Sequence, residues 1–254
     1  MACCHLPTRR LFIDRLSIQA NHRYCSTRQL TTTLQQTAKH SQTFCSVIGI
    51  VSAITNEGVI GINGKLPWYT TPISIDRDHF VNLTRNKILI IGRKTFSNED
   101  PTGSHIRHVR LCIVVSKTMQ HIDLTDAYNK DDGDFPVVRL ARSFKDALKI
   151  VSEYVEDDVQ NSCDRIDGNH DVMTDKIQCW VAGGENIYRE ALRHNNAVEV
   201  HLTHVNMSID TTSKCEVVYF PMAILVEHGY QETSRRDEGN CSFCVYKKSS
   251  QKKT

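Results

Sequence analysis

Long apolar runs are missing from this 254-residue sequence. The longest, at 87–92 and 223–226, have only the length of a strand. A membrane-spanning helix needs about 20 consecutive apolar residues, so we expect no membrane partner. The apolar core of a secretory signal peptide is also missing at the N-terminus. We therefore expect the ten cysteines to be reduced thiols in a reducing compartment, and not a disulfide set.

Acidic residues are scarce at the N-terminus, where residues 1–45 hold six Lys or Arg and the single acid Asp14. A segment rich in Arg, Ser, Thr and Gln is typical of a mitochondrial transit peptide. We expect residues 1–44 to be a disordered extension that directs the protein to mitochondria; the alternative is an untargeted extension and a cytosolic protein. The segment lacks the interleaved aromatic residues of a single-strand binder, so no nucleic acid is required as a partner.

Apolar strands alternate with helical segments from Phe44 onward. Uninterrupted apolar strands such as 88–91 and 111–115 predict a sheet that is covered on both faces. The expected fold class is α/β: a mostly parallel central sheet with an antiparallel C-terminal edge and helices on both faces, in one domain over residues 45–249. Strands are predicted at 45–54, 87–92, 109–115, 136–140, 178–182, 198–205 and 241–247, and helices at 74–85, 93–97, 143–154 and 184–193.

Two further segments are predicted to have no chemistry of their own. Residues 156–175 hold seven acids and one arginine, which is typical of a mobile surface insertion. Cys241 and Cys244 fall in a predicted strand, where residues three apart point to opposite faces. We therefore expect no metal site.

The stretch Gly58–Trp68 (GVIGINGKLPW) connects the first strand to the first helix. Its glycines and its Leu-Pro-Trp end give a loop with unusual backbone freedom, of the kind that covers a ligand. An ordinary turn with a tryptophan in the core is the alternative. Asp76 follows this loop, and it either caps the helix or faces a cleft, where a carboxylate can hold the amidine-like edge of a heterocycle by two hydrogen bonds. Both roles can coexist.

Two junctions between a strand and a helix are candidate phosphate sites. Gly92–Thr95 follows an apolar strand and opens a helix, where free N–H groups favour anions, and Arg93 and Lys94 add positive charge. Gly183–Gly184 lies at a second such junction, where close packing of strand and helix is the alternative explanation. Two phosphate sites on one sheet predict a dinucleotide across its carboxyl edge.

The motifs occur in the order Ile60–Gly61 with Leu66–Trp68, Asp76 with Phe80, Gly92–Thr95, Ile113–Ser116, Val181–Gly184 followed by Tyr188, Leu202–His204, and Phe220–Pro221. In this order they resemble dihydrofolate reductase over residues 45–247. The resemblance implies the fold of that family, the cofactor NADPH, the substrate dihydrofolate and a monomer. We expect no fused thymidylate synthase domain, because few residues follow the last predicted strand.

The resemblance also implies roles for individual residues. Four residues would be catalytic. Asp76 would hold the pterin ring, and Thr203 would hydrogen-bond to that ring. Trp68 would hold a water molecule, and Tyr188 would lie beside the nicotinamide. Val51 and Phe80 would be apolar walls around the substrate, and Arg110 would clamp its glutamate carboxylate. The expected cofactor contacts are Ala53 and Ile60 at the carboxamide; Arg93, Ser116 and Lys117 at the 2′-phosphate; Thr95, Gly184, Glu185 and Asn186 at the pyrophosphate; and Gly61, Gly92, Lys94, Ala182, Gly183, Ile187 and Tyr188 around them.

Two positions depart from the family pattern. Arg77 stands where an apolar residue usually packs on the substrate, and Glu99 stands where an apolar residue usually flanks the benzoyl ring. Both favour an alternative function, a catalytically weak paralogue that binds folate or a protein partner. The related riboflavin-pathway reductase is a further alternative, but it lacks the Pro-Trp loop followed by an acid eight residues later.

Overall fold

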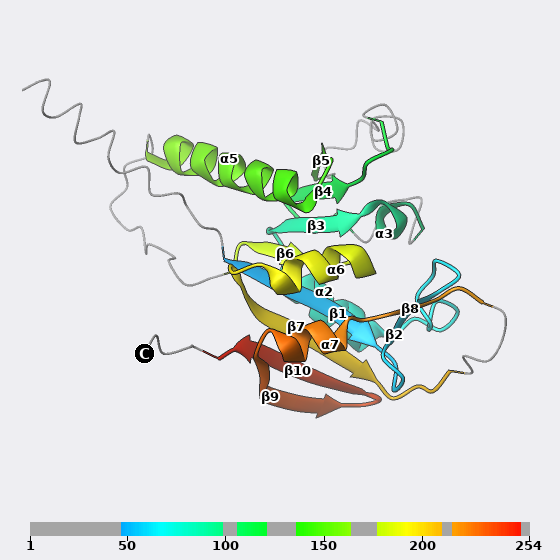
Figure 1. The fold of residues 1–254 in the computed structure, drawn as a ribbon. Helices are drawn as coiled ribbons and strands as arrows, with labels where there is room; N and C mark the ends of the chain where they lie inside the picture. Colours follow the sequence, from blue (N-terminus) through cyan, green and yellow to red (C-terminus); the bar gives the residue numbers. More distant parts are fainter. Residues whose placement is uncertain (1–46, 99–105, 121–135, 164–176, 210–214, 250–254) are drawn as a thin grey trace, which may run out of the picture. The chain divides into compact units, whose positions relative to one another are not determined.

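An eight-stranded sheet forms the centre of the protein in a computed structural model that describes residues 47–98, 106–120, 136–163, 177–209 and 215–249 (Figure 1). The strands from β5 to β7 pair in parallel, whereas β10 is antiparallel to both of its neighbours. This confirms the predicted fold class. The strand order is β5 (Val137–Ala141), β4 (Leu111–Val115), β3 (Ile88–Gly92), β6 (Cys179–Val181), β1 (Ile48–Ile54), β7 (Ala197–Val205), β10 (Cys241–Lys248) and β9 (Tyr230–Glu238).

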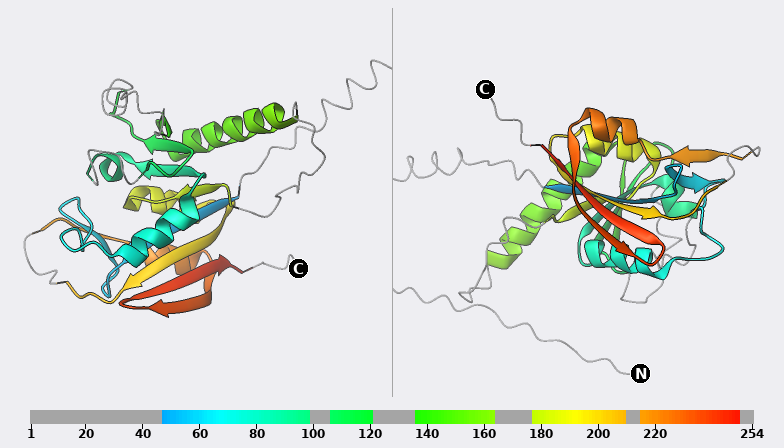
Figure 2. Two further views of the ribbon diagram at one scale, coloured as in Figure 1. Left: turned by 180° about the vertical axis from the view of Figure 1, so that it is seen from behind. Right: turned by 90° about the horizontal axis from the view of Figure 1, so that it is seen from below.

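Side chains alternate between two apolar cores on the two faces of the sheet. In β3, Ile88 and Ile90 belong to one core, while Leu89 and Ile91 belong to the other, as the two-residue period of a strand requires. The first core contains residues of α5 (Phe144–Cys163), α6 (Glu185–Arg193) and α7 (Met222–Glu227), and the second contains residues of α2 (Ser74–Thr84) and α3 (Arg93–Asn98). Figure 2 shows α6 and α7 on the face opposite α2.

A separate two-stranded sheet pairs β2 (Val59–Ile62) with β8 (Val217–Tyr219). Where β1 meets β2, Thr55 N–H donates to the carbonyl of Val59 at 3.1 Å. This sheet therefore carries the first half of the ligand-covering loop predicted at Gly58–Trp68, called the lid below, which was expected to be a loop throughout. The second half, up to Trp68, contains turns.

The structure differs from the predicted elements in four further respects. β8, α7 and β9 were not predicted, and α5 continues to Cys163, so the first residues of the predicted acidic insertion are helical. The N-terminal extension 1–44, Glu99 and the rest of the insertion lie outside the described residues. Among the described helices, none has the length and apolar composition to cross a membrane.

Candidate active site

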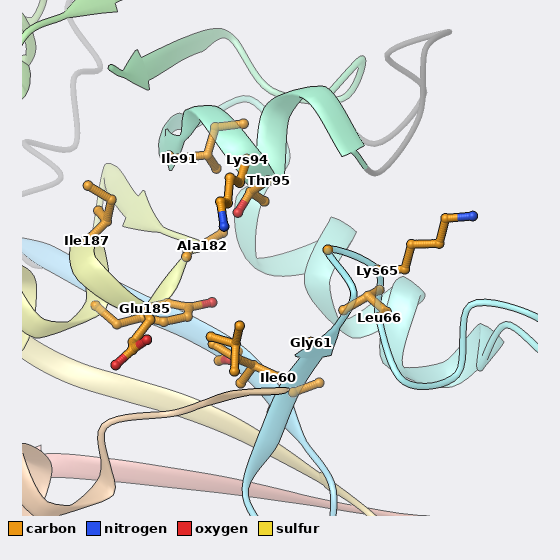
Figure 3. Close-up of a pocket in the computed structure, with 18 of the residues that line it drawn as sticks. Ile60, Gly61, Lys65, Leu66, Ile91, Lys94, Thr95, Ala182, Glu185 and Ile187 are labelled. Carbon is orange, nitrogen blue, oxygen red and sulfur yellow. The ribbon is translucent and has the colours of Figure 1, made fainter. Parts of the chain in front are cut away.

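A cavity of about 880 Å³ lies at the carboxyl ends of the parallel strands. Its size falls in the range of ligand pockets, about 300–1,000 Å³, and its place is where open α/β sheets bind their ligands. Figure 3 shows three of the segments that surround it: β2 with the turn that follows, the β3–α3 junction, and the β6–α6 junction. These segments contain motifs that were identified in the sequence.

Nearly every predicted site residue lines this cavity, and Thr203 and Arg110 are the exceptions. Thr203 lies directly behind the wall, because its hydroxyl is hydrogen-bonded to Asp76. The predicted residues that line the cavity are Val51, Ala53, Ile60, Gly61, Trp68, Asp76, Phe80, Gly92, Arg93, Lys94, Thr95, Ser116, Lys117, Ala182, Gly183, Gly184, Glu185, Asn186, Ile187 and Tyr188.

Asp76 is a largely buried carboxylate in the first turn of α2. The N-cap of this helix is Ile73, which makes no side-chain cap bond, so Asp76 is not the cap residue. Burial raises the pKa of Asp76 above its ordinary value, and the hydrogen bond from Thr203 lowers it in part. Thr203 is itself buried in β7, between Ala53 of β1 and Phe243 of β10. A single acid held in this way can bind a cationic or amidine-like edge of a ligand.

The surroundings of Asp76 are mainly apolar. Trp68 is 3% exposed and packs in one cluster with Val205, Cys241 and Phe243. Burial raises the pKa of the Cys241 thiol to about 11, with a further contribution from the charge of Asp76. Cys241 is therefore a neutral thiol near the carboxylate, and the negative charge at this end of the cavity comes from Asp76.

The β6–α6 junction approaches β3 through glycine backbone. Gly92 N–H donates to the carbonyl of Gly183 at 2.7 Å, and the peptide bond between Gly183 and Gly184 is cis. Gly183 has φ of +110°, and a Cβ there would lie 3.2 Å from the Tyr188 hydroxyl, so a side chain is disfavoured on both counts. The Tyr188 hydroxyl donates to the carbonyl of Val51 at 2.9 Å, which ties α6 to β1.

Three cations, Arg93, Lys94 and Lys117, line the opposite part of the cavity, and all three are exposed. Ser116 lies beside them. Its Oγ accepts hydrogen bonds from the backbone N–H of Thr118 and of Met119, at 3.3 and 3.0 Å, so its oxygen shapes the turn and its O–H can still donate.

Glu185 also lines the cavity, as the first residue of α6. Its Oε1 accepts from two nitrogens of Arg189, at 2.9 and 2.6 Å, so its negative charge is compensated within α6. The carboxylate therefore opposes an anionic ligand less than an unpaired acid would.

The structure does not bring Arg110 to the cavity. It precedes β4 at the amino end of the sheet, and its Nε donates to the Tyr154 hydroxyl at 3.1 Å. Ser116 lies six residues further on, about 20 Å along a strand. Arg77 does line the cavity, but it is exposed, so its charge can stay hydrated.

The cavity wall also contains residues to which the sequence analysis assigned no individual role. Ile91 and Val115 lie at the carboxyl ends of the parallel strands β3 and β4, and that position was the signal for them. Glu216 and Val218 come from β8 and its approach, which no pattern predicted. The additional lining residues are Ser52, Gly64, Lys65, Leu66, Tyr69, Pro72, Ile73, Val81, Leu89, Ile91, Val115, Thr118, Glu216 and Val218.

Comparison with known proteins agrees with this arrangement. A putative dihydrofolate reductase from Caenorhabditis elegans is 30% identical over 166 residues, which cover 62% of this chain and 71% of that protein. The dihydrofolate reductase of Heliothis virescens is 26% identical over 208 residues, or 78% of this chain and 95% of that protein. The dihydrofolate reductase family model matches residues 47–248. This chain therefore belongs to the dihydrofolate reductase family, whose members are oxidoreductases that reduce dihydrofolate.

Proposed function

We propose that this protein catalyses the NADPH-dependent reduction of 7,8-dihydrofolate to 5,6,7,8-tetrahydrofolate and so supplies one-carbon metabolism. The observation that carries the proposal is the buried Asp76, held by Thr203 in the wall of a cavity whose other end is lined by exposed cations. One end suits a heterocycle with an amidine-like edge, and the other suits a phosphorylated cofactor.

The residues fit NADPH in two respects. Gly184 leaves backbone accessible at the start of α6, where a Cβ would meet Thr95 Oγ1 at 3.5 Å, so this surface suits a pyrophosphate that needs close approach. Arg93 and Lys117, with Ser116 beside them, supply charge and a hydroxyl for a 2′-phosphate, which NADH lacks. When bound, the cofactor supplies the hydride that reduces C6 of the substrate.

The chain itself contributes binding, orientation and control of a proton. The Asp76 carboxylate would hold the pterin edge, and its negative charge would favour a proton on the neighbouring N5, which water under the lid can deliver. Val51 and Phe80 would fix the ring between apolar walls, and Trp68 would help to exclude bulk water. Arg110 remains a predicted clamp for the distant carboxylate of a long substrate.

A coupled assay that follows NADPH oxidation with dihydrofolate tests this function. We expect turnover with NADPH and dihydrofolate together and none with either alone. Binding of folate without turnover would favour the weak paralogue instead. Mitochondrial targeting, proposed from the composition of residues 1–44, is tested by fusing this segment to a fluorescent protein, and a fusion that stays in the cytosol would overturn it.

A further inference from the structure

An exposed ion pair joins two walls of the cavity. Lys94 Nζ lies 2.9 Å from Glu216 Oε1, and both residues line the cavity. Lys94 is the second residue of α3, and Glu216 directly precedes β8. The two residues are 122 positions apart in the sequence, so no sequence pattern predicts their contact.

The backbone of Glu216 is fixed to the β2–β8 sheet. Its N–H donates to Asn63 Oδ1 at 3.0 Å, and its carbonyl accepts from the N–H of Asn63 at 2.8 Å. The next residue, Val217, pairs with Ile62 of β2. The carboxylate of Glu216 is therefore presented to Lys94 by the same small sheet that brings Ile60 and Gly61 to the cavity.

The exposure of the pair decides what it can do. The side chains of Lys94 and Glu216 are 68% and 61% exposed. Such pairs contribute little to folding stability, because water and salt screen them and the side chains lose freedom. An anionic ligand can exchange with the carboxylate for the same reason. Loss of the pair should therefore change ligand affinity more than folding stability.

We propose that Glu216 sets cofactor affinity by competing with the phosphates of NADPH for Lys94. Cofactor binding would release Glu216 from Lys94, and return of the carboxylate would assist cofactor release. This inference rests on the proposed function, since NADPH is the anionic ligand. The alternative is that the pair is a strut that holds β8 against α3, in which case its loss would weaken cofactor binding.

The substitution Glu216→Gln distinguishes the two roles, because it keeps the size of the side chain and removes its charge. Binding of NADPH to the full chain is measured by quenching of tryptophan fluorescence, at low and at high ionic strength. We expect the dissociation constant to fall about two- to fivefold at low ionic strength, the range for an exposed pair, and the difference to shrink in salt. The cofactor should also dissociate more slowly.

Two further variants serve as controls. Glu153→Gln on α5 removes a carboxylate that pairs with Lys149 at 3.6 Å, away from the cavity lining, and should leave binding unchanged. Lys94→Gln should weaken binding, and adding Glu216→Gln to it should have no further effect, because the competitor then has no cation to occupy.

Unchanged or weaker binding in Glu216→Gln, with normal binding in the wild type, would overturn this inference and leave the proposed function intact. A benefit of Glu216→Gln that persists in the Lys94→Gln background would also overturn it. Failure of the wild type to bind NADPH would overturn the proposed function and this inference together.

Discussion

The two ends of the cavity hold charge in opposite ways. Asp76 is largely buried, is hydrogen-bonded to Thr203, and shares its part of the cavity wall with the buried Trp68. Arg93 and Lys117 stand exposed at the other end. The effective dielectric constant is low around a buried charge and high around an exposed one, so the same unit of charge acts far more strongly at the Asp76 end.

Because of this contrast, the two ends of the cavity suit different tasks. A buried, precisely oriented acid suits the chemical step, where a change in one protonation state alters the barrier. Exposed cations suit a cofactor that must bind and leave in every cycle, since each contact is weak, additive and sensitive to salt. Substitutions at the two ends should therefore differ in size, in salt dependence and in pH dependence.

Removal of the buried charge should have the largest effect. In Asp76→Asn the neutral amide no longer favours the proton on the substrate, and turnover near pH 7 should fall about 10²- to 10⁴-fold, the range for positioned acid–base groups. The rate of the variant should rise steadily as the pH is lowered, without the plateau that titration of Asp76 sets in the wild type. Steady-state assays across pH measure both effects.

Asp78→Asn is the matched control, because Asp78 lies on the same helix but is exposed. It should turn over at the wild-type rate, and NADPH should bind both variants nearly as tightly as the wild type. Normal turnover of Asp76→Asn at pH 7 would remove the central residue of the proposed site.

Removal of two exposed cations should have a smaller effect, confined to one cofactor. In Arg93→Ala with Lys117→Ala, the Michaelis constant for NADPH should rise about 10- to 100-fold, because each contact with the 2′-phosphate is charge-assisted but screened by water. The constant for NADH should change little, and the effect should shrink in salt. Equal effects on both cofactors would place the 2′-phosphate elsewhere. Lys145→Ala with Lys149→Ala on α5 controls for net charge.

Loss of the partner of the buried acid should be smaller still. Thr203→Val removes the hydroxyl that lowers the pKa of Asp76, so this pKa should rise further and the acidic plateau of turnover should begin at a higher pH. Near pH 7 we expect a loss of about three- to tenfold, the scale of one hydrogen bond. Thr203→Ser keeps the hydroxyl and should keep the wild-type profile. A Val variant with that same profile would show that Thr203 has only a packing role.

The sequence predicted the cavity well because its walls are built from local patterns. β1, β3 and β4 are apolar runs, and the glycines and cations that follow strands mark the carboxyl edge of the sheet. The roles assigned to these residues remain predictions. Local sequence patterns could not predict contacts between distant segments, such as Thr203 with Asp76 or Lys94 with Glu216. Thr203 was named only through the family resemblance.

The elements that were missed have physical reasons in common. β9 is an edge strand whose residues after Tyr230 are all exposed, so it has no apolar alternation. β8 has three residues and α7 has six, too few to show a period. α5 continues to Cys163, into the segment whose acidic composition suggested an insertion. β9 therefore formed through strand pairing without an apolar alternation, whereas α7 buries Ile224 and Leu225 but is too short for its apolar face to show in the sequence.

The last prediction concerns stability. Because burial raises the pKa of Asp76, the native state holds more protons than the unfolded state between the ordinary value of 3.8 and the raised one. This carboxyl therefore lowers stability as the pH rises through that window, and its full cost is present above it. Asp76→Asn removes the cost, so the variant should be more stable than the wild type above the window and equally stable below it.

Other groups titrate in the same range, and the comparison must cancel them. Burial lowers the pKa of His79 from 6.5 to about 4, so its contribution to stability is lost as the pH falls from 6.5 to about 4, in both proteins alike. The difference between the unfolding free energies of variant and wild type, from urea titrations across that range and into neutral pH, isolates Asp76. An Asn variant that is less stable than the wild type at neutral pH would mean that the hydrogen bond between Thr203 and the charged carboxylate outweighs the cost of its burial. The charge of Asp76 would then stabilise the folded protein, and Asp76 would differ from the exposed cations only in its location in the cavity.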